Sequence, residues 1–163
     1  MKDLLLPIIG AVLFISVVGY FSNNIAKNGV PSLAPQDQKK VNISIDDTVV
    51  DAEVVDTPAT REKGLSGKAS LCESCGMLFD FNTAQNKYPS FWMKDMLFLI
   101  DIIWINHEKE IVQIDKAVEP PPSGTKDSNL KLYQSPEPIE YVLEVNAGFT
   151  DQNGVEVGDT ANF

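Results

Sequence analysis

The run from Phe91 to Ile105, FWMKDMLFLIDIIWI, restricts the possible fold more than any other stretch, because it is apolar apart from three charged residues. It is too short for a membrane helix, which needs about 20 apolar residues, and each charge near the centre of such a helix costs about 2.5–3.5 kcal/mol. Strands accommodate the pattern, since successive side chains point to opposite faces. The stretch therefore predicts two short strands, and on the second Asp101 shares a face with Ile103 and Ile105.

Asp101 is thus expected on an apolar face. Its carboxylate needs hydrogen bonds, an ion pair or an opening to a cleft there, because burying a lone charge is prohibitive. Two interpretations remain open. Either Asp101 ties down a neighbouring loop through backbone N–H groups, or it is a cleft residue held beside Trp92. Lys94 is the nearest basic partner along the chain.

The sequence after the linker predicts further short elements. Residues 41–55 contain two β-branched runs around a pair of aspartates, which indicates a half-buried hairpin. Residues 56–67 predict a short helical turn that starts after Thr57 and ends at Gly64 or Gly67. The five prolines of residues 118–140 forbid a central strand and predict an extended loop.

The remaining segments complete a mainly β pattern. Strands are expected at residues 76–81, 88–94, 100–105, 110–115, 141–145 and 155–163. Asn146 is expected to cap a short helix that follows it. The fold class is mainly β (α+β), a small barrel or sandwich of about seven short strands with one or two short helices, preceded by one N-terminal hydrophobic helix.

That N-terminal helix covers Leu4 to Phe21, 18 residues without a charge. At a helical rise of 1.5 Å per residue it spans about 27 Å, just enough for a bilayer core. A retained anchor is favoured over a cleaved signal peptide, after which the chain would be secreted. The predicted organisation is an anchor or signal segment at 1–22, a polar linker at 23–40 and a soluble β-rich domain at 41–163. The few flanking lysines barely favour an outward domain, so an extracytoplasmic location is an inference.

The chain is acidic, with a formal net charge of −10. Such a surface repels phosphate backbones, which makes nucleic acid a poor partner. It is also repelled by anionic lipid, and this suits a domain held on a tether.

Cys72 and Cys75, in LCESCG, are the only cysteines. A redox motif of this spacing needs a thioredoxin-like βαβ context, which is absent. A zinc site needs two further ligands, and His107 is the single histidine. A local disulfide in an oxidising compartment is favoured over both, with two free thiols as the other possibility, and no metal or other cofactor is expected.

Four segments, TREKGLSG, GMLFDF, FWMKDMLFLIDIIWI and YVLEVNAGF with GVEVGD, follow one another in an order that resembles an uncharacterised bacterial and archaeal family, domain of unknown function number 192. The resemblance covers about Val41 to Thr160. It implies a compact β-rich fold in an extracytoplasmic setting and no settled activity. Its recurring positions fall here on Arg61, Gly64, Gly76, Met77, Phe91, Trp92, Met93, Asp101, Glu144, Asn146 and Gly148. The chain departs from the pattern at Ile100, where proline is common, and at Asp95, where asparagine is common.

Two classes of function fit these residues. The first is a membrane-tethered extracytoplasmic binding or accessory domain for an envelope sugar, peptide or protein, with aromatic surfaces and directional polar partners. Its candidate ligand-binding residues are Arg61, Trp92, Lys94, Asp101 and Glu144. The alternative is a hydrolase of cell-envelope polymers in which Asp101 and Glu144 act as general acid and base, provided that both face one cleft. A structural role in an envelope assembly is a third possibility.

Overall fold

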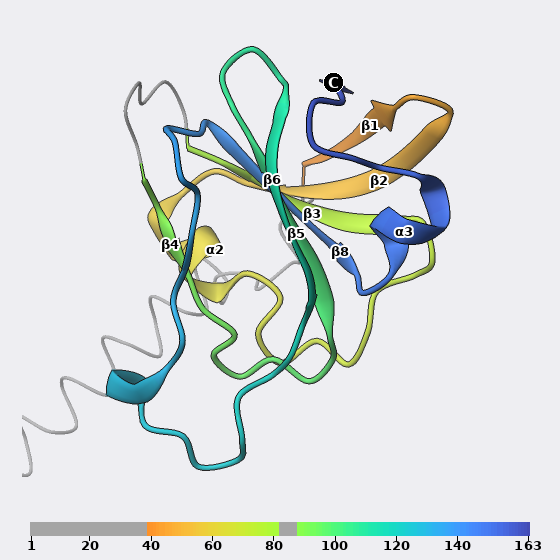
Figure 1. Cartoon of the computed structure of the whole chain (residues 1–163). Coiled ribbons are helices and arrows are strands. Elements are labelled where there is room, and N and C mark those ends of the chain that lie inside the picture. Colours follow the sequence, from red (N-terminus) through yellow and green to blue (C-terminus); the bar gives the residue numbers. More distant parts are fainter. Residues whose placement is uncertain (1–38, 82–87) are drawn as a thin grey trace, which may run out of the picture. The chain divides into compact units, whose positions relative to one another are not determined.

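The computed structural model describes residues 39–81 and 88–163, which belong to one compact, mainly β unit (Figure 1). These residues form nine strands, two short α-helices and one 3-10 turn. The elements are β1 (Lys40–Ile45), β2 (Thr48–Val55), α2 (Pro58–Lys63), β3 (Cys75–Asp80), β4 (Ser90–Phe91), β5 (Ile100–Ile105), β6 (Ile111–Val118), η1 (Asp127–Asn129), β7 (Tyr133–Gln134), β8 (Tyr141–Asn146), α3 (Phe149–Asn153) and β9 (Ala161–Asn162).

The expected hydrophobic segment at 1–22 and nearly all of the expected linker lie outside the described residues. Within the described ranges, none of the helices has the length and apolar character needed to cross a membrane.

Seven strands form one sheet in the order β6-β5-β8-β3-β2-β1-β9. Neighbours are antiparallel except β2 and β3, which run parallel on either side of α2 in the chain. The sheet curls so that its edges meet at one end, where the N–H of Ile111 donates to the carbonyl of Asp159 and that of Ala161 to Lys109, both at 2.8 Å. The result is a curled half-barrel, and β4 and β7 pair beside it as a separate small sheet.

The local predictions at the start of the domain are confirmed. β1 and β2 form an antiparallel hairpin with Val50 and Ala52 buried. Thr57 caps α2: its hydroxyl accepts from the N–H of Thr60 at 3.2 Å, and the hydroxyl of Thr60 accepts from the N–H of Thr57 at 3.1 Å. This capping box satisfies backbone donors that have no partner inside the helix. The helix ends at Gly64, whose φ of 46° suits glycine.

One local prediction is wrong, and three are confirmed only in part. Asn146 does not cap α3, which begins after Gly148. Asn146 ends β8 instead, and its side-chain amide donates to the carbonyl of Cys72 at 2.8 Å. The loop at 118–140 contains the two-residue strand β7, which sequence periodicity cannot reveal because it is so short. For the same reason β4 and β9 cover only parts of the segments expected at 88–94 and 155–163.

Both faces of the central sheet are buried, each against its own hydrophobic cluster. Ile103 and Ile105 of β5 lie in the cluster that includes Phe149 of α3. Ile102 and Trp104 lie in the cluster on the other face, beneath α2 and β4. The alternation predicted for β5 is therefore confirmed, and the two faces position two acidic residues in different surroundings.

Candidate functional site

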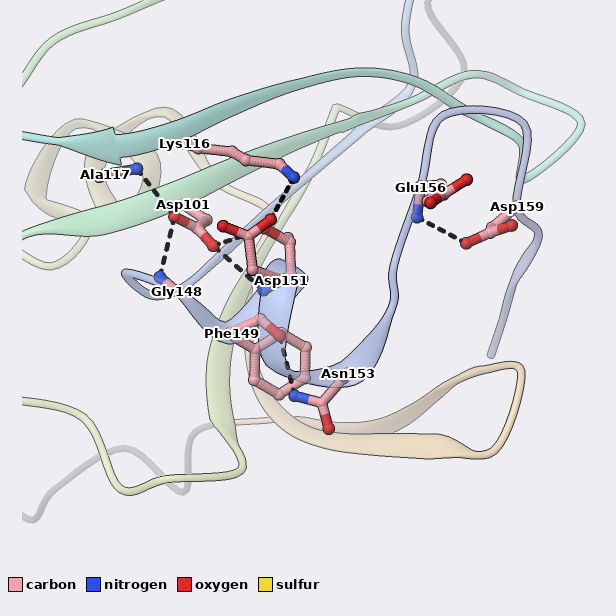
Figure 2. A network of polar contacts seen from close by, with 10 residues as sticks. Asp101, Lys116, Ala117, Gly148, Phe149, Asp151, Asn153, Glu156 and Asp159 are labelled. Carbon is pink, nitrogen blue, oxygen red and sulfur yellow. Dashed lines mark hydrogen bonds and ion pairs between the residues drawn. The ribbon is translucent and has the colours of Figure 1, made fainter.

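Asp101 is fully buried and accepts four hydrogen bonds (Figure 2). Its Oδ1 accepts from the N–H of Ala117 at 2.9 Å and of Gly148 at 3.2 Å. Its Oδ2 accepts from the N–H and the hydroxyl of Thr150 at 3.1 and 2.8 Å. These donors replace the water that an ionised carboxylate loses on burial.

The backbone is shaped to deliver those donors. The β5–β6 register shifts between Ile100 and Ile102, so a bulge in β6 lies opposite Asp101. Within this bulge Ala117 adopts a φ of 49°, an unusual value for a residue with a side chain. Gly148, with a φ of 82°, turns the chain from β8 into α3. Asp101 therefore connects three elements, which is the loop-tying interpretation of its role.

The other interpretation of Asp101 finds no support in the geometry. Asp101 does not line the pocket that contains Trp92. Lys94 is not its partner, because the Lys94 ammonium pairs with Asp127 at 2.6 Å at the surface. Lys116 is the nearby cation instead. Its pKa is raised, chiefly by its hydrogen bond to Asp151 and in smaller part by the charge of Asp101.

Glu144 lies on the opposite face of the sheet from Asp101. In the β5–β8 register Glu144 pairs with Ile102, whereas Asp101 pairs with Val145. Residues directly opposite one another in an antiparallel pair point to the same face. The structure therefore separates the two carboxylates, and no single cleft contains both.

Glu144 opens instead onto a cavity of about 220 Å³, which we call the aromatic pocket. It lies between α2, β3, β4 and β8; α2 and β4 lie side by side in Figure 1. Four aromatic rings line it together with leucine, methionine and proline side chains. The residues that define the pocket are Arg61, Glu62, Lys63, Gly64, Leu65, Ser66, Phe79, Phe81, Pro89, Ser90, Phe91, Trp92, Met96 and Glu144.

The carboxyl group of Glu144 is the unusual member of this pocket. The residue is only 5% exposed, and it forms no hydrogen bond or ion pair through its side chain in the described part of the chain. Burial raises the pKa of Glu144 to about 8, because the surroundings do not offset the loss of hydration of the charged form. Near neutral pH the carboxyl group therefore retains its proton in most of the molecules.

Arg61 and Trp92 complete the polar and aromatic character of the aromatic pocket. One terminal nitrogen of Arg61 donates to the carbonyls of Asp56 at 2.5 Å and Asp80 at 2.8 Å. The guanidinium carbon lies 5.0 Å from the centre of the Phe81 ring. Trp92 is 44% exposed, so part of its ring is accessible from solvent. Three of the five predicted ligand-binding residues, Arg61, Trp92 and Glu144, are thus brought together.

Sequence reasoning missed the wall formed by Phe79 and Phe81. Both residues lie in the predicted strand GMLFDF, two positions apart, and Phe79 lies opposite Val142 while Met77 lies opposite Glu144. Side chains two positions apart in a strand point to the same face. Once β3 is paired with β8, Phe79 and Phe81 therefore lie on the same face as Glu144.

A larger groove of about 930 Å³ runs between β6 and the proline-containing loop. Its lining includes Met93, Tyr133 and three lysines, of which Lys116 is paired with Asp151 and Lys131 lies over the Tyr133 ring at 4.4 Å. None of the predicted ligand-binding residues lines this groove.

Cys72, in the loop before β3, forms a disulfide with Cys75, the first residue of that strand. In the ranges 39–81 and 88–163, no three His, Cys, Asp or Glu side chains gather closely enough to hold a metal ion. The chemistry available at the aromatic pocket is therefore that of a carboxyl group, a guanidinium group and aromatic rings.

The fold and the pocket define a class: a small, mainly β domain that keeps an unpaired carboxyl group inside an aromatic cavity. The chain belongs to the DUF192 family, described as uncharacterized ACR, whose model matches residues 41–163. This confirms the family resemblance read from the four sequence segments. None of the curated proteins matches the chain in sequence.

Two crystal structures resemble the domain. A putative transcription regulator from Sinorhizobium meliloti 1021 is 27% identical, with a TM-score of 0.67 over 77% of this chain and 94% of that one. A protein of unknown function from Novosphingobium aromaticivorans DSM 12444 is 23% identical, with a TM-score of 0.69 over 85% of this chain and 96% of that one. The second likeness shows that the fold is shared.

Proposed function

We propose that this protein is a membrane-tethered, extracytoplasmic binding domain whose aromatic pocket takes part of an envelope sugar, peptide or protein. The observation that carries the proposal is that an accessible Trp92 ring and the buried, unpaired carboxyl group of Glu144 line the same cavity. Burying a polar group without a partner costs free energy. A site that keeps such a group in the lining of an aromatic cavity has the features of a ligand pocket.

The size of the pocket limits what it can hold. Its volume of about 220 Å³ lies below the roughly 300–1,000 Å³ of pockets for drug-sized ligands. One sugar ring or one amino-acid side chain fits such a space better than a polymer segment does. The ligand is therefore a single ring or side chain of a larger molecule, or a small free molecule.

Membrane tethering and location outside the cytoplasm are supported by the sequence. The uncharged run at residues 4–21 has the length of a membrane anchor. A disulfide between Cys72 and Cys75 suits an oxidising compartment.

The similar Sinorhizobium meliloti protein is described as a putative transcription regulator, which raises the question of DNA binding. A net charge of −10 argues against it, because phosphate backbones need a basic surface.

The hydrolase alternative lacks comparable support. Asp101 and Glu144 extend from opposite faces of the sheet, and the four donors around Asp101 leave it no role at the aromatic pocket. A mechanism with two carboxyl groups requires both beside one scissile bond.

A thermal-shift screen of the full-length protein in detergent tests the proposal. Envelope mono- and disaccharides and short peptides are added singly, and a ligand of the native state raises Tm by mass action. The same ligand should lose its effect on the Trp92→Ala variant. The ligand should still raise the Tm of the Leu132→Ala variant, which lacks an exposed side chain outside the aromatic pocket.

Two results would contradict the proposal. One is a screen in which no compound shifts Tm. The other is a ligand whose shift is as large with Trp92→Ala as with the unmodified chain, since binding would then occur elsewhere.

A further inference from the structure

We propose that the aromatic pocket binds an ammonium group on a short aliphatic stem, with the Glu144 carboxylate as counter-ion and the Trp92 ring as one wall. The inference rests on the proposed binding function and names the chemistry of the ligand. A lysine side chain of a peptide and an amine-bearing lipid headgroup share this chemistry.

The strands around Glu144 leave it no internal partner. β8 lies between β3 and β5, and Glu144 is directly opposite Met77 on one side and Ile102 on the other. Both neighbours are apolar and 1% exposed. Among the described residues, every side-chain nitrogen or oxygen that is fully enclosed has a hydrogen-bond partner. The Glu144 carboxyl group has no partner there, so its oxygens are not fully enclosed. Its oxygens therefore keep their small exposure at the aromatic pocket, which is where a partner can reach them.

The other charged groups of the aromatic pocket all come from α2. Arg61 is already engaged by two backbone carbonyls and the Phe81 ring. Glu62 and Lys63 are exposed and of opposite sign, so their fields largely cancel. Glu144 is therefore the ionisable group of the pocket whose negative charge no neighbouring group offsets. When Glu144 is ionised, a cation supplies the compensation that the pocket lacks, whereas an anion would add a second buried negative charge.

The walls of the aromatic pocket suit a cation as well. The faces of aromatic rings attract ammonium and guanidinium groups, and tryptophan does so best. Arg61 over Phe81 is an example of this contact at the pocket wall. Leu65 and Met96 offer an apolar surface against which an aliphatic stem can pack.

Binding of the cation should release a proton. Burial raises the pKa of Glu144 to about 8, so at lower pH a protonated carboxyl group must lose its proton to form the carboxylate–ammonium pair. The ammonium group keeps its own proton, and the proton of Glu144 goes to the buffer. Affinity should consequently rise about tenfold per pH unit below pH 8 and level off above it.

The experiment is calorimetric titration of the full-length protein in detergent with n-butylammonium, pentanol and pentanoate, three probes of similar size and different charge. We expect butylammonium to bind at least tenfold more tightly than the other two. At pH 6.5, heats in two buffers of different ionisation enthalpy should reveal about one proton released per ligand bound, because the cation displaces it. Nα-acetyl-lysine amide and phosphoethanolamine then distinguish a peptide source from a lipid source.

Two variants make the test specific. Glu144→Gln should weaken butylammonium binding at least tenfold at pH 8 and abolish the proton release. Glu73→Gln makes the same chemical change at an exposed position outside the aromatic pocket and should leave both unchanged. The charge preference and the pH profile of the unmodified chain remain informative even if one variant does not fold.

The outcomes separate this inference from the function on which it rests. If pentanol or pentanoate binds as tightly as butylammonium, and Trp92→Ala abolishes that binding, the pocket is a ligand site and the cation preference is wrong. If butylammonium binds with no dependence on Glu144 or pH, the counter-ion role is wrong. The proposed binding function itself would be wrong if, in the thermal-shift screen, no ligand depended on Trp92.

Discussion

At the scale of single residues, two acids on adjacent strands show opposite solutions to the burial of a carboxyl group. Asp101 and Glu144 are both at most 5% exposed. Asp101 receives four donors from the chain, and Glu144 receives none from the described residues. The difference arises because the two residues lie on opposite faces of the sheet. Asp101 therefore has a structural role, whereas Glu144 is a candidate ligand-binding residue.

The uncompensated burial of Glu144 predicts a pH-dependent stability. Its folded pKa of about 8 lies above its ordinary value of 4.5, so the contribution of Glu144 is fully favourable below pH 4.5 and is lost as pH rises through 8. Glu144→Gln lacks this loss. We expect the unfolding free energy of the variant, minus that of the unmodified chain, to grow with pH between 5 and 8, by at most about 1.4 kcal/mol per pH unit.

Urea unfolding at several pH values, followed by the fluorescence of the buried Trp104, provides the measurement. Lys109, whose pKa is lowered to about 8 by burial, titrates in both proteins and cancels in the difference. Parallel stability curves for the two proteins would show that Glu144 is solvated or paired in solution.

At the scale of elements, the Asp101 network determines how β6 and α3 are attached to β5. Asp101→Ala leaves backbone N–H groups of Ala117, Gly148 and Thr150 without their acceptor. A buried donor left without an acceptor costs about 1–3 kcal/mol, and among these three the N–H of Thr150 is buried. We expect Asp101→Ala to lower the unfolding free energy by about 3 kcal/mol, because several donors lose their acceptor together, and Asp101→Asn, which keeps one acceptor, to lower it by less.

Asp151→Ala is the control for this comparison. It removes another carboxylate from the same region (Figure 2), but the ion pair that it breaks, with Lys116, has both side chains about half exposed or more. Such a surface pair contributes about 0–1 kcal/mol. A urea midpoint for Asp101→Ala no lower than that of Asp151→Ala would exclude the structural role of Asp101.

The elements also show what the sequence could predict. The β1–β2 hairpin, α2 and the alternation in β5 depend on neighbours within a few residues, and all three were predicted correctly. The donors of Asp101 come from positions 16 to 49 residues away, and no local pattern points to them. The separation of Asp101 from Glu144 depends on the register of β5 with β8, which alternation within either strand leaves open.

At the scale of the whole molecule, the sequence predicts the candidate site only in part, because strand pairing over long distances in sequence decides which residues meet. Arg61, Trp92 and Glu144 belong to three separate segments of the sequence, and the fold brings them to one cavity. Lys94 is close to Asp101 in sequence, but in the fold it pairs with Asp127. Residue type thus indicated which side chains could bind a ligand, while the sheet order decided which of them meet.

The compartment in which the chain folds determines the state of its two cysteines. If the domain lies outside the cytoplasm, Cys72 and Cys75 form their disulfide during biogenesis, since oxidising compartments permit it and the cytosol keeps thiols reduced. Full-length protein isolated from membranes without reductant should therefore show no thiol that reacts with a maleimide after denaturation, and two after reduction. A Cys72→Ser variant, with one thiol before and after reduction, calibrates the count of thiols.

Carbonate washing tests the anchor separately. It should leave the full chain in the membrane fraction, whereas a chain lacking residues 1–22 should be released from it. Two reactive thiols in the unreduced protein would contradict both the disulfide and the extracytoplasmic location, and release of the full chain by carbonate would contradict the anchor alone.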